Sequence, residues 1–218
     1  AEKDIELDLS DREYDILLGT QMVAKGLDFP NVTLVGVLAA DASLNLPDYR
    51  SCEKTFQLIT QVAGRAGRGL KPGRVVVQSY QPGHYSIQYA SKHDYTGFYG
   101  REIDIRSKFS YPPFSHIIRI LIIGEQEKEL VQYSKNMVEW IKEQVEGDLL
   151  LKEGLLDLGA YAAPIERINN KYRWQVLLRI RTGQKYRDSY HRLSDMLIRR
   201  FYHDTITVTL DFNPLSLI

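Results

Sequence analysis

Two arginines, Arg65 and Arg68, lie three residues apart, and each directly follows a glycine. A guanidinium group is planar, offers several N–H donors and stays charged at physiological pH, so it can stabilise negative charge that develops during phosphoryl transfer. Gly64 and Gly67 keep the backbone narrow, which allows two guanidinium groups to enter a crowded cleft. We therefore predict that these arginines take part in nucleotide hydrolysis. The alternatives are a solvated Gly/Arg loop and an arginine–glycine segment that binds RNA.

A second block, residues 19–30, follows an apolar run at residues 14–19 that predicts a parallel strand buried on both faces. This strand would deliver the block to its carboxyl end, the edge at which open α/β sheets bind ligands. There Thr20 can donate a hydrogen bond to a DNA phosphate and Lys25 can add positive charge, and neither contact depends on base sequence. Taken singly, Thr20 also suits a helix cap, Lys25 a solvated surface and Asp28 a turn.

Residues 1–81 have the pattern of an α/β lobe with a parallel sheet. Apolar spacing predicts two further strands and a helix between them, at residues 32–40, 73–78 and 50–63 respectively. The helix would bury Phe56, Ile59 and Val62. Strand, helix and strand in alternation indicate an α/β fold with a parallel sheet.

Residues 82–112 are predicted to form a helical connector. Helical spacing covers residues 84–90 and 94–109, with Asp94 as an N-cap. Pro112 and Pro113 end the second helix, because proline lacks a backbone donor and restricts the preceding residue.

Residues 113–218 are predicted to form a smaller C-terminal α/β domain. The expected elements are a strand, a helix, two strands joined by a hairpin at Asn169–Asn170, a helix and a last strand. In chain order, we place them at residues 116–124, 127–145, 155–168, 172–180, 186–202 and 205–212. This β-α-β-β-α-β order is that of the ferredoxin-like plait.

The formal net charge is zero, yet the charges are unevenly distributed. Residues 165–200 carry ten Lys or Arg against three Asp or Glu, and such a patch can bind DNA phosphates or an acidic peptide. Arg167, Lys171 and Arg173 lie around the hairpin. Strand alternation places Arg173 on the face opposite Trp174, which favours a core position for Trp174 over a role in base stacking.

The composition predicts no metal, disulfide or membrane span in this chain. Cys52 is the only cysteine, and the five histidines have no ligand spacing with carboxylates. Apolar runs are too short to cross a membrane, so we expect a cytoplasmic protein. The chain also lacks a Gly-x-x-x-x-Gly-Lys-Ser/Thr loop and an acidic pair for magnesium, and it starts without methionine. We therefore expect a C-terminal fragment whose ATP and magnesium ligands lie mostly in an absent first lobe.

The blocks at residues 16–26 and 61–68, with residues 48–58 and 111–114, resemble the PriA family of superfamily 2 helicases, also called primosomal protein N′. The resemblance implies an ATP-dependent 3′–5′ DNA helicase that recognises stalled or abandoned forks and restarts replication by primosome assembly. It implies catalysis by Arg65 and Arg68 and the end of a second RecA-like lobe in residues 1–81. It also implies ATP-binding residues Gly26, Asp28, Gln61, Gly64, Arg65 and Arg68, and DNA-binding residues Thr20, Gln21, Lys25, Arg167, Lys171 and Arg173.

In the C-terminal domain, residues 171–175 resemble a family Arg-x-Arg-Trp-Gln segment. This resemblance implies that Lys171, Trp174 and Gln175 contact the acidic tail of single-stranded DNA-binding protein. Lysine at the first position keeps the charge but loses the bidentate geometry of arginine. Other implied partners are forked DNA, single-stranded DNA and the proteins that load the primosome and the replicative helicase. The family's zinc-binding cysteines would lie upstream of residue 1.

Two alternative functions remain at this stage: a DNA-fork or partner-binding scaffold without enzymatic activity, and an RNA helicase. The Gly and Arg residues of the block at 61–68 favour an active motor. We expect the 218-residue chain alone to lack ATPase and unwinding activity, because the phosphate-binding loop is absent from its sequence.

Overall fold

The computed structural model describes residues 15–19, 32–64, 66 and 72–217. The chain forms two compact units, residues 1–103 and 104–218. The helices predicted as a connector at residues 82–112 lie largely within the first unit, because the pair formed by Ile87 and Phe98 belongs to its core.

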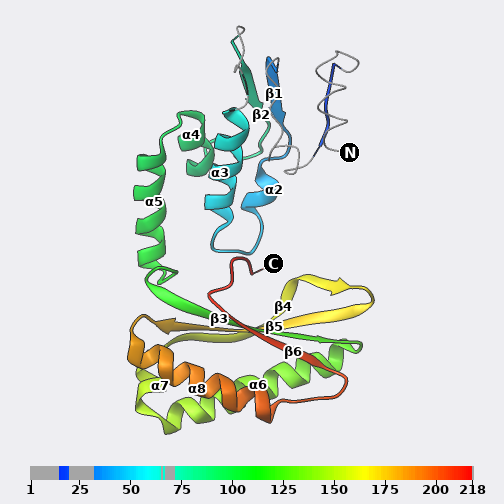
Figure 1. Cartoon of the computed structure of the whole chain (residues 1–218), viewed down its shortest axis with the longest axis vertical. Helices are drawn as coiled ribbons and strands as arrows, with labels where there is room; N and C mark the ends of the chain where they lie inside the picture. The colour runs from blue at the N-terminus through cyan, green and yellow to red at the C-terminus, as the bar shows by residue number, and fades with distance from the viewer. Residues whose placement is uncertain (1–14, 20–31, 65, 67–71, 218) are drawn as a thin grey trace. The chain divides into compact units, whose positions relative to one another are not determined.

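The first unit is an α/β structure with two parallel strands (Figure 1). Its elements are β1 (Leu34–Val37), α2 (Asp41–Leu44), α3 (Ser51–Ala63), β2 (Arg74–Val77), α4 (Tyr85–Ser91) and the greater part of α5 (Tyr95–Lys108). Its core comprises Val37, Ala40, Phe56, Ile59, Ile87, Ala90 and Phe98. The α/β class and the parallel pairing predicted from the sequence are confirmed.

The prediction of a strand at residues 14–19 is wrong for the part of this segment that the structure describes. Asp15–Gly19 form no strand, and Ile16 and Leu18 are almost fully exposed. An apolar run forms a buried parallel strand only when neighbouring strands pair with its backbone on both sides. In the described residues β1 and β2 pair with each other and not with this segment.

Side chains cap both helices that follow β2. Asp94 accepts a hydrogen bond from the Gly97 N–H at 2.8 Å, which confirms its predicted capping of α5. His84 Nδ1 accepts one from the Ser86 N–H at 3.3 Å at the start of α4, a cap that the sequence did not lead us to expect.

The second unit is a four-stranded antiparallel sheet in the order β4-β5-β3-β6. Its elements are β3 (Ser115–Gly124), α6 (Glu127–Gly147), α7 (Leu149–Gly154), β4 (Leu155–Ile168), β5 (Lys171–Arg181), α8 (Gln184–Arg200) and β6 (Thr207–Phe212). This is the strand order of the ferredoxin-like plait, so the predicted topology is confirmed. The sequence did not predict the short helix α7, which Asp148 caps by accepting from the Leu150 N–H at 2.8 Å.

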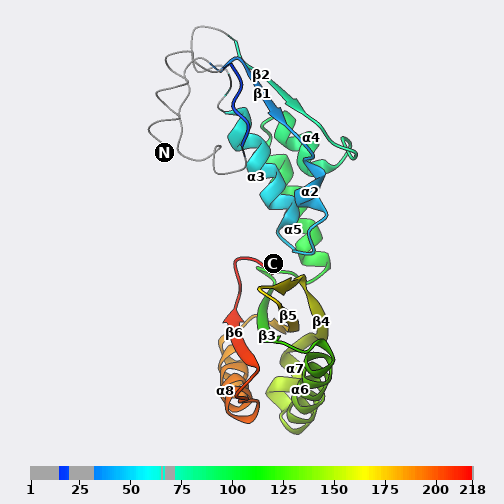
Figure 2. The ribbon, with the colours of Figure 1, turned by 90° about the vertical axis from the view of Figure 1, so that its right-hand side faces the viewer.

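Helices α6, α7 and α8 lie on one face of this sheet (Figure 2). Ile118, Ile120 and Ile122 of β3 point toward the helices and are almost fully buried. The alternate residues of each strand form the opposite face, called the open face below. Among the described residues no helix is long and apolar enough to cross a membrane.

Candidate nucleotide and nucleic-acid sites

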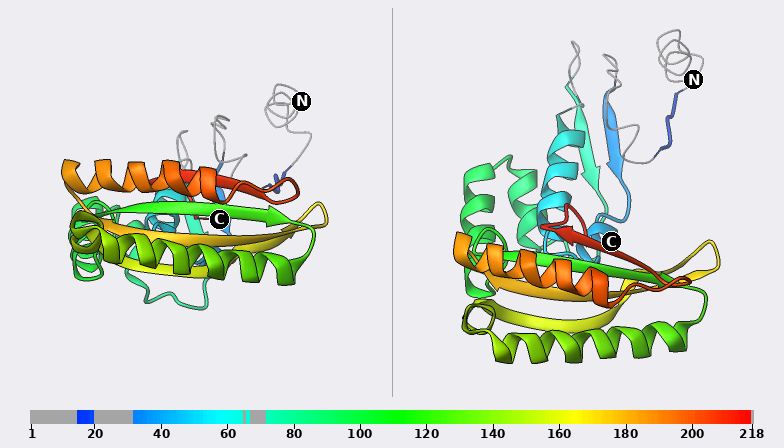
Figure 3. Two further views of the ribbon diagram at one scale, coloured as in Figure 1. Left: turned by 90° about the horizontal axis from the view of Figure 1, so that it is seen from below. Right: turned by 60° about the horizontal axis from the view of Figure 1, so that its bottom comes forward.

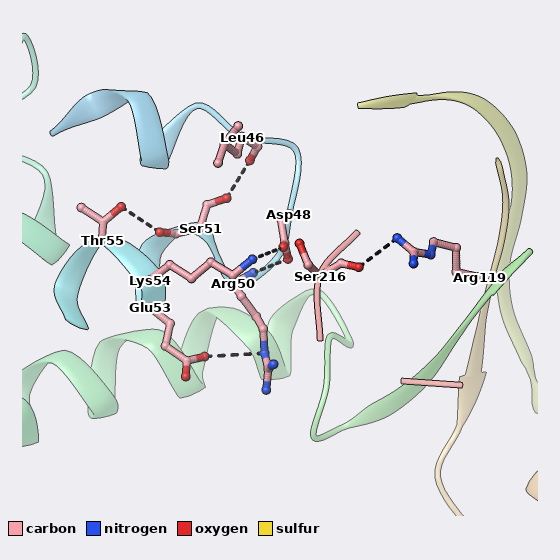
Figure 4. Close-up of polar contacts among 9 residues, drawn as sticks. All are labelled: Leu46, Asp48, Arg50, Ser51, Glu53, Lys54, Thr55, Arg119 and Ser216. Atoms are coloured by element: carbon pink, nitrogen blue, oxygen red, sulfur yellow. Dashed lines mark hydrogen bonds and ion pairs between the residues drawn. The ribbon is translucent and has the colours of Figure 1, made fainter. Parts of the chain in front are cut away.

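The start of α3 is held by a short network of hydrogen bonds (Figure 4). Asp48 accepts from the Arg50 N–H at 3.0 Å and from Lys54 Nζ at 2.7 Å, and its carboxylate is buried. Ser51 Oγ donates to the Leu46 carbonyl oxygen at 2.7 Å. Because the buried carboxylate of Asp48 accepts from both a backbone N–H and a lysine, it holds Arg50 and Lys54 in place, and the helix begins from a defined turn.

Aromatic packing then fixes the face that α3 buries. The ring of Phe56 stacks on that of Phe98, with centroids 4.2 Å apart and planes at 11°. Ile59, one turn further on, is fully buried. The helix ends at Gly64, whose N–H donates to the Thr60 carbonyl oxygen at 3.0 Å, and Gln61 is exposed in the last turn. Thus α3 carries the chain to the point at which the arginine block begins.

The residues that follow the two predicted blocks lead into the sheet of the first unit at the same end of its strands. Residues 32–33, which follow the first block, lead into β1, and residues 72–73, which follow the second, lead into β2. These strands run parallel from the pair Leu34–Arg74 onward, and the Arg74 N–H donates to the Thr33 carbonyl oxygen at 2.8 Å. This is the amino end of β1 and β2, and most of the residues of the two blocks lie outside the described part of the chain.

Most of the ATP-binding and DNA-binding residues predicted in the first unit lie outside the described part of the chain. They are Thr20, Gln21, Lys25, Gly26, Asp28, Arg65 and Arg68. Of the remaining two, Gln61 and Gly64 are described, and both lie at the end of α3. Their roles stay predictions.

At the other end of the two strands, Asp41 joins the residues that follow β1 and β2. It accepts hydrogen bonds from Ser79 Oγ at 2.6 Å and from the backbone N–H groups of Tyr80 and Gln81 at 2.6 and 3.1 Å. The Ser79 hydroxyl, followed by these backbone donors, lowers the pKa of Asp41 against an opposing effect of burial. Asp41 is not among the residues predicted from the sequence, although an aspartate soon after a strand was the available signal.

We expect Asp41→Asn to destabilise the protein at neutral pH. The carboxylate accepts from three donors, whereas the amide turns one acceptor into a donor. Because the folded-state pKa is lowered, the stabilisation is complete above the unfolded-state pKa and is lost as pH falls through the folded-state pKa. Thermal unfolding should therefore show a difference from wild type that shrinks in acid. Asp104→Asn, which alters an exposed pair with Lys108, is the control, and an equal change in both variants would contradict this role of Asp41.

The predicted hairpin is present, and its turn lies at one end of the second unit's sheet, in yellow in Figure 3. Asn169 and Asn170 adopt φ values of 50° and 62°, as a two-residue hairpin turn requires. The turn separates the predicted DNA-binding cations. Lys171 and Arg173 belong to the open face, whereas Arg167 lies over the Tyr172 ring, 4.9 Å from its centroid, on the helix side.

Two further predicted residues of this strand also lie on opposite faces. Trp174 packs against the core beneath the helices, in agreement with the alternation of the strand. Gln175 lies on the open face, is 5% exposed, and its Oε1 has no hydrogen-bond partner in the part of the chain that the structure describes. The structure therefore groups Lys171, Arg173 and Gln175 and separates them from Arg167 and Trp174. The partner-binding roles stay predictions.

Other cations of the basic segment hold the fold together. Arg179 donates from Nη1 to the Phe109 carbonyl oxygen at 2.7 Å, and its Nη2 lies 3.4 Å from Asp157. Arg181 donates to the Glu153 carbonyl oxygen at 3.0 Å. Arg173, nearer the turn, also donates from Nη1 to the Ile165 carbonyl oxygen at 3.1 Å across the hairpin.

Arg65 and Arg68 have the donor chemistry that phosphate oxygens require, and their role in a nucleotide site stays a prediction. Within the described ranges no group of three His, Cys, Asp or Glu could hold a metal ion. The expectation that the chain alone binds no zinc stays a prediction.

Comparison with known proteins gives two family models and a set of relatives. The helicase conserved C-terminal domain model matches residues 1–69, and the primosomal protein N C-terminal domain model matches residues 107–215. The replication restart protein PriA of Bacillus subtilis is 42% identical over 200 residues, which are 92% of this chain and 24% of that protein. The PriA proteins of Synechocystis sp. and Borreliella burgdorferi are 40% and 34% identical over 94% and 95% of this chain. The matched residues make up 23% and 30% of these two proteins, so the chain spans about a quarter of the length of its relatives.

Proposed function

Since this chain belongs to the PriA family of replication restart proteins, we propose that it is part of an ATP-dependent DNA helicase that moves 3′ to 5′ and remodels abandoned replication forks. The complete protein would act in the cytoplasm, with a first lobe outside residues 1–218 supplying the phosphate loop and the magnesium ligands. Residues 1–81 would supply the last motifs of the second lobe.

The observation that supports this proposal is that the residues following the two sequence blocks, 32–33 and 72–73, lead into the adjacent parallel strands β1 and β2 at the same end. A motor of this type needs groups that touch ATP and groups that touch the DNA backbone on one rigid support, so that changes at the nucleotide reach the DNA. Here the described residues that follow both blocks belong to one pair of parallel strands, and α3, which packs through Phe56, ends at Gly64, immediately before Arg65 in the sequence.

Each side chain in these blocks has a distinct proposed role. Arg65 and Arg68 stabilise the charge that develops on the transferred phosphoryl group of bound ATP. Gly64 and Gln61 keep this segment close to the nucleotide, and Gly26 and Asp28 contact it from the first block. Thr20, Gln21 and Lys25 hold DNA phosphates, which makes the motor indifferent to base sequence.

The second unit would add a binding surface at the end of its hairpin. We assign Lys171 and Arg173 to DNA phosphates or to the acidic tail of single-stranded DNA-binding protein, with Gln175 beside them on the open face. Arg167 would contribute from the helix side. Proteins that load the primosome and the replicative helicase are the further partners that we propose for the complete protein.

Reversing Lys171 and Arg173 to Glu is expected to weaken binding to duplex DNA or to the acidic tail. Each lost phosphate contact removes about 0.9 from the negative slope of log affinity against log salt concentration, so the double variant should lower that slope by about 1.8. Fluorescence anisotropy at several salt concentrations measures this. Arg167→Glu, on the opposite face, should weaken binding less, and unchanged affinity of the double variant for both ligands would contradict the assignment.

The experiment that tests the proposed function is strand separation. The full-length protein should separate a forked DNA with ATP, and residues 1–218 alone should neither hydrolyse ATP nor separate strands. A full-length protein that binds forks without ATP-dependent strand separation would instead be a scaffold. DNA-stimulated hydrolysis by residues 1–218 alone would contradict the placement of the phosphate loop in another lobe.

A further inference from the structure

The open face of the second unit carries an exposed tyrosine in an unusual setting. Tyr161 of β4 is 50% exposed, and its neighbours Ala160 and Ala162 lie on the helix side of the strand. A Cβ built on Gly159, two residues earlier on the same face, would lie 2.7 Å from Tyr161 Cε2. The ring therefore occupies the space above Gly159, which only glycine leaves empty. The hydroxyl end of the ring lies over Gly159, and the Tyr161 residue remains half exposed to solvent.

The residues around this ring on the open face have side chains suited to binding a nucleotide. Gln175 lies directly opposite Tyr161 on β5, and its buried Oε1 lacks a hydrogen-bond partner among the described residues. Arg173 and Lys171 follow on the same face of β5, roughly 7 and 13 Å from Gln175 along the strand. Asp157, the acidic neighbour on β4, is paired with Arg179.

From this arrangement we propose that Tyr161 is a stacking platform for an unpaired base of single-stranded DNA, with Lys171 and Arg173 holding the adjoining phosphates. An aromatic ring that lies on a sheet can stack on any base, and nearby cations follow the backbone. Duplex DNA keeps its bases inside the helix and cannot use the ring. An acidic peptide could use the cations but has no need of the ring. The choice of DNA over RNA rests on the proposed function.

Photo-cross-linking tests this platform in the full-length protein without nucleotide. An oligothymidylate that carries one 5-iodouracil should cross-link to Tyr161, as identified by mass spectrometry. Tyr161→Leu should abolish that cross-link and weaken oligothymidylate binding by at least about fivefold, since one base stacked on an aromatic ring contributes about 1–3 kcal/mol. Tyr161→Phe should keep both properties, because it keeps the ring.

Two variants separate stacking from general damage to the unit. Gly159→Ala should displace the ring without removing it, and should weaken oligothymidylate binding more than duplex binding. Tyr202→Leu removes a more exposed tyrosine that follows α8 and should leave the cross-link unchanged. Thermal unfolding of each variant checks the fold.

Wild-type affinity in a folded Tyr161→Leu variant would overturn the proposal. So would a loss confined to an acidic peptide, which would identify a peptide site. Equal losses for oligothymidylate and oligouridylate support stacking and contradict only the choice of DNA. Because the cross-link needs no ATP turnover, an inactive motor would count against the proposed function without deciding the result for Tyr161.

Discussion

Replacing Arg68 with Ala in the full-length protein is expected to lower kcat for ATP hydrolysis by about three to five powers of ten. The guanidinium group would meet negative charge that is greatest in the transition state, so its loss should reduce kcat and leave the KM for ATP nearly unchanged. DNA affinity should change little, because Thr20 and Lys25 are the proposed contacts to the DNA backbone. Steady-state ATPase assays with saturating DNA measure both constants.

Arg101→Ala is the matched control for this experiment. Arg101 is an exposed arginine in the middle of α5 and belongs to the same unit. Its replacement should leave kcat within about twofold of wild type, since surface substitutions seldom change stability by more than about 0.5 kcal/mol. An Arg68→Ala enzyme with near-normal kcat would contradict the assignment of the arginine block, whatever the control shows.

Replacing Phe56 with Ala is expected to lower the free energy of unfolding of the first unit by about 3–5 kcal/mol. The side chain is only 5% exposed and stacks on Phe98, so its removal leaves a cavity between α3 and α5. The surrounding side chains relax only partly into such a cavity, so most of the contacts that Phe56 makes are not replaced. Denaturant titration, with a probe that reports on the first unit, measures the change.

Gln57→Ala on the same helix provides the comparison. Gln57 is exposed and donates to Glu53 on its own helix, so its loss should cost less than about 0.5 kcal/mol. A loss below about 1 kcal/mol for Phe56→Ala would show that α3 is not held by this stack, and the support proposed for the arginine block would then be wrong.

Local patterns were sufficient to predict most of the second unit. The strands and helices of residues 115–212 follow alternation and helical spacing, and the two asparagines at 169–170 select one turn. Strand alternation was also sufficient to place Trp174 with the core. Such features depend on neighbours within a few residues, which a single sequence displays.

Features that depend on distant partners could not be predicted. A strand at residues 14–19 requires pairing partners, and among the described residues it has none. The donors to Asp41 lie 38 to 40 residues away, beyond any local pattern. The sequence does not show that the ring of Tyr161 lies over Gly159. It also groups Arg167 with Lys171 in one basic segment, whereas the strand register places the two residues on opposite faces of the sheet.

The most direct test of the central claim is the stimulation of ATP hydrolysis by different nucleic acids. Full-length protein should hydrolyse ATP faster with forked DNA than with duplex DNA of the same length, and RNA should give little stimulation. The Arg68→Ala variant should abolish the forked-DNA response. Equal or greater stimulation by RNA would contradict a replication-fork helicase, and no stimulation by any nucleic acid would contradict a motor altogether.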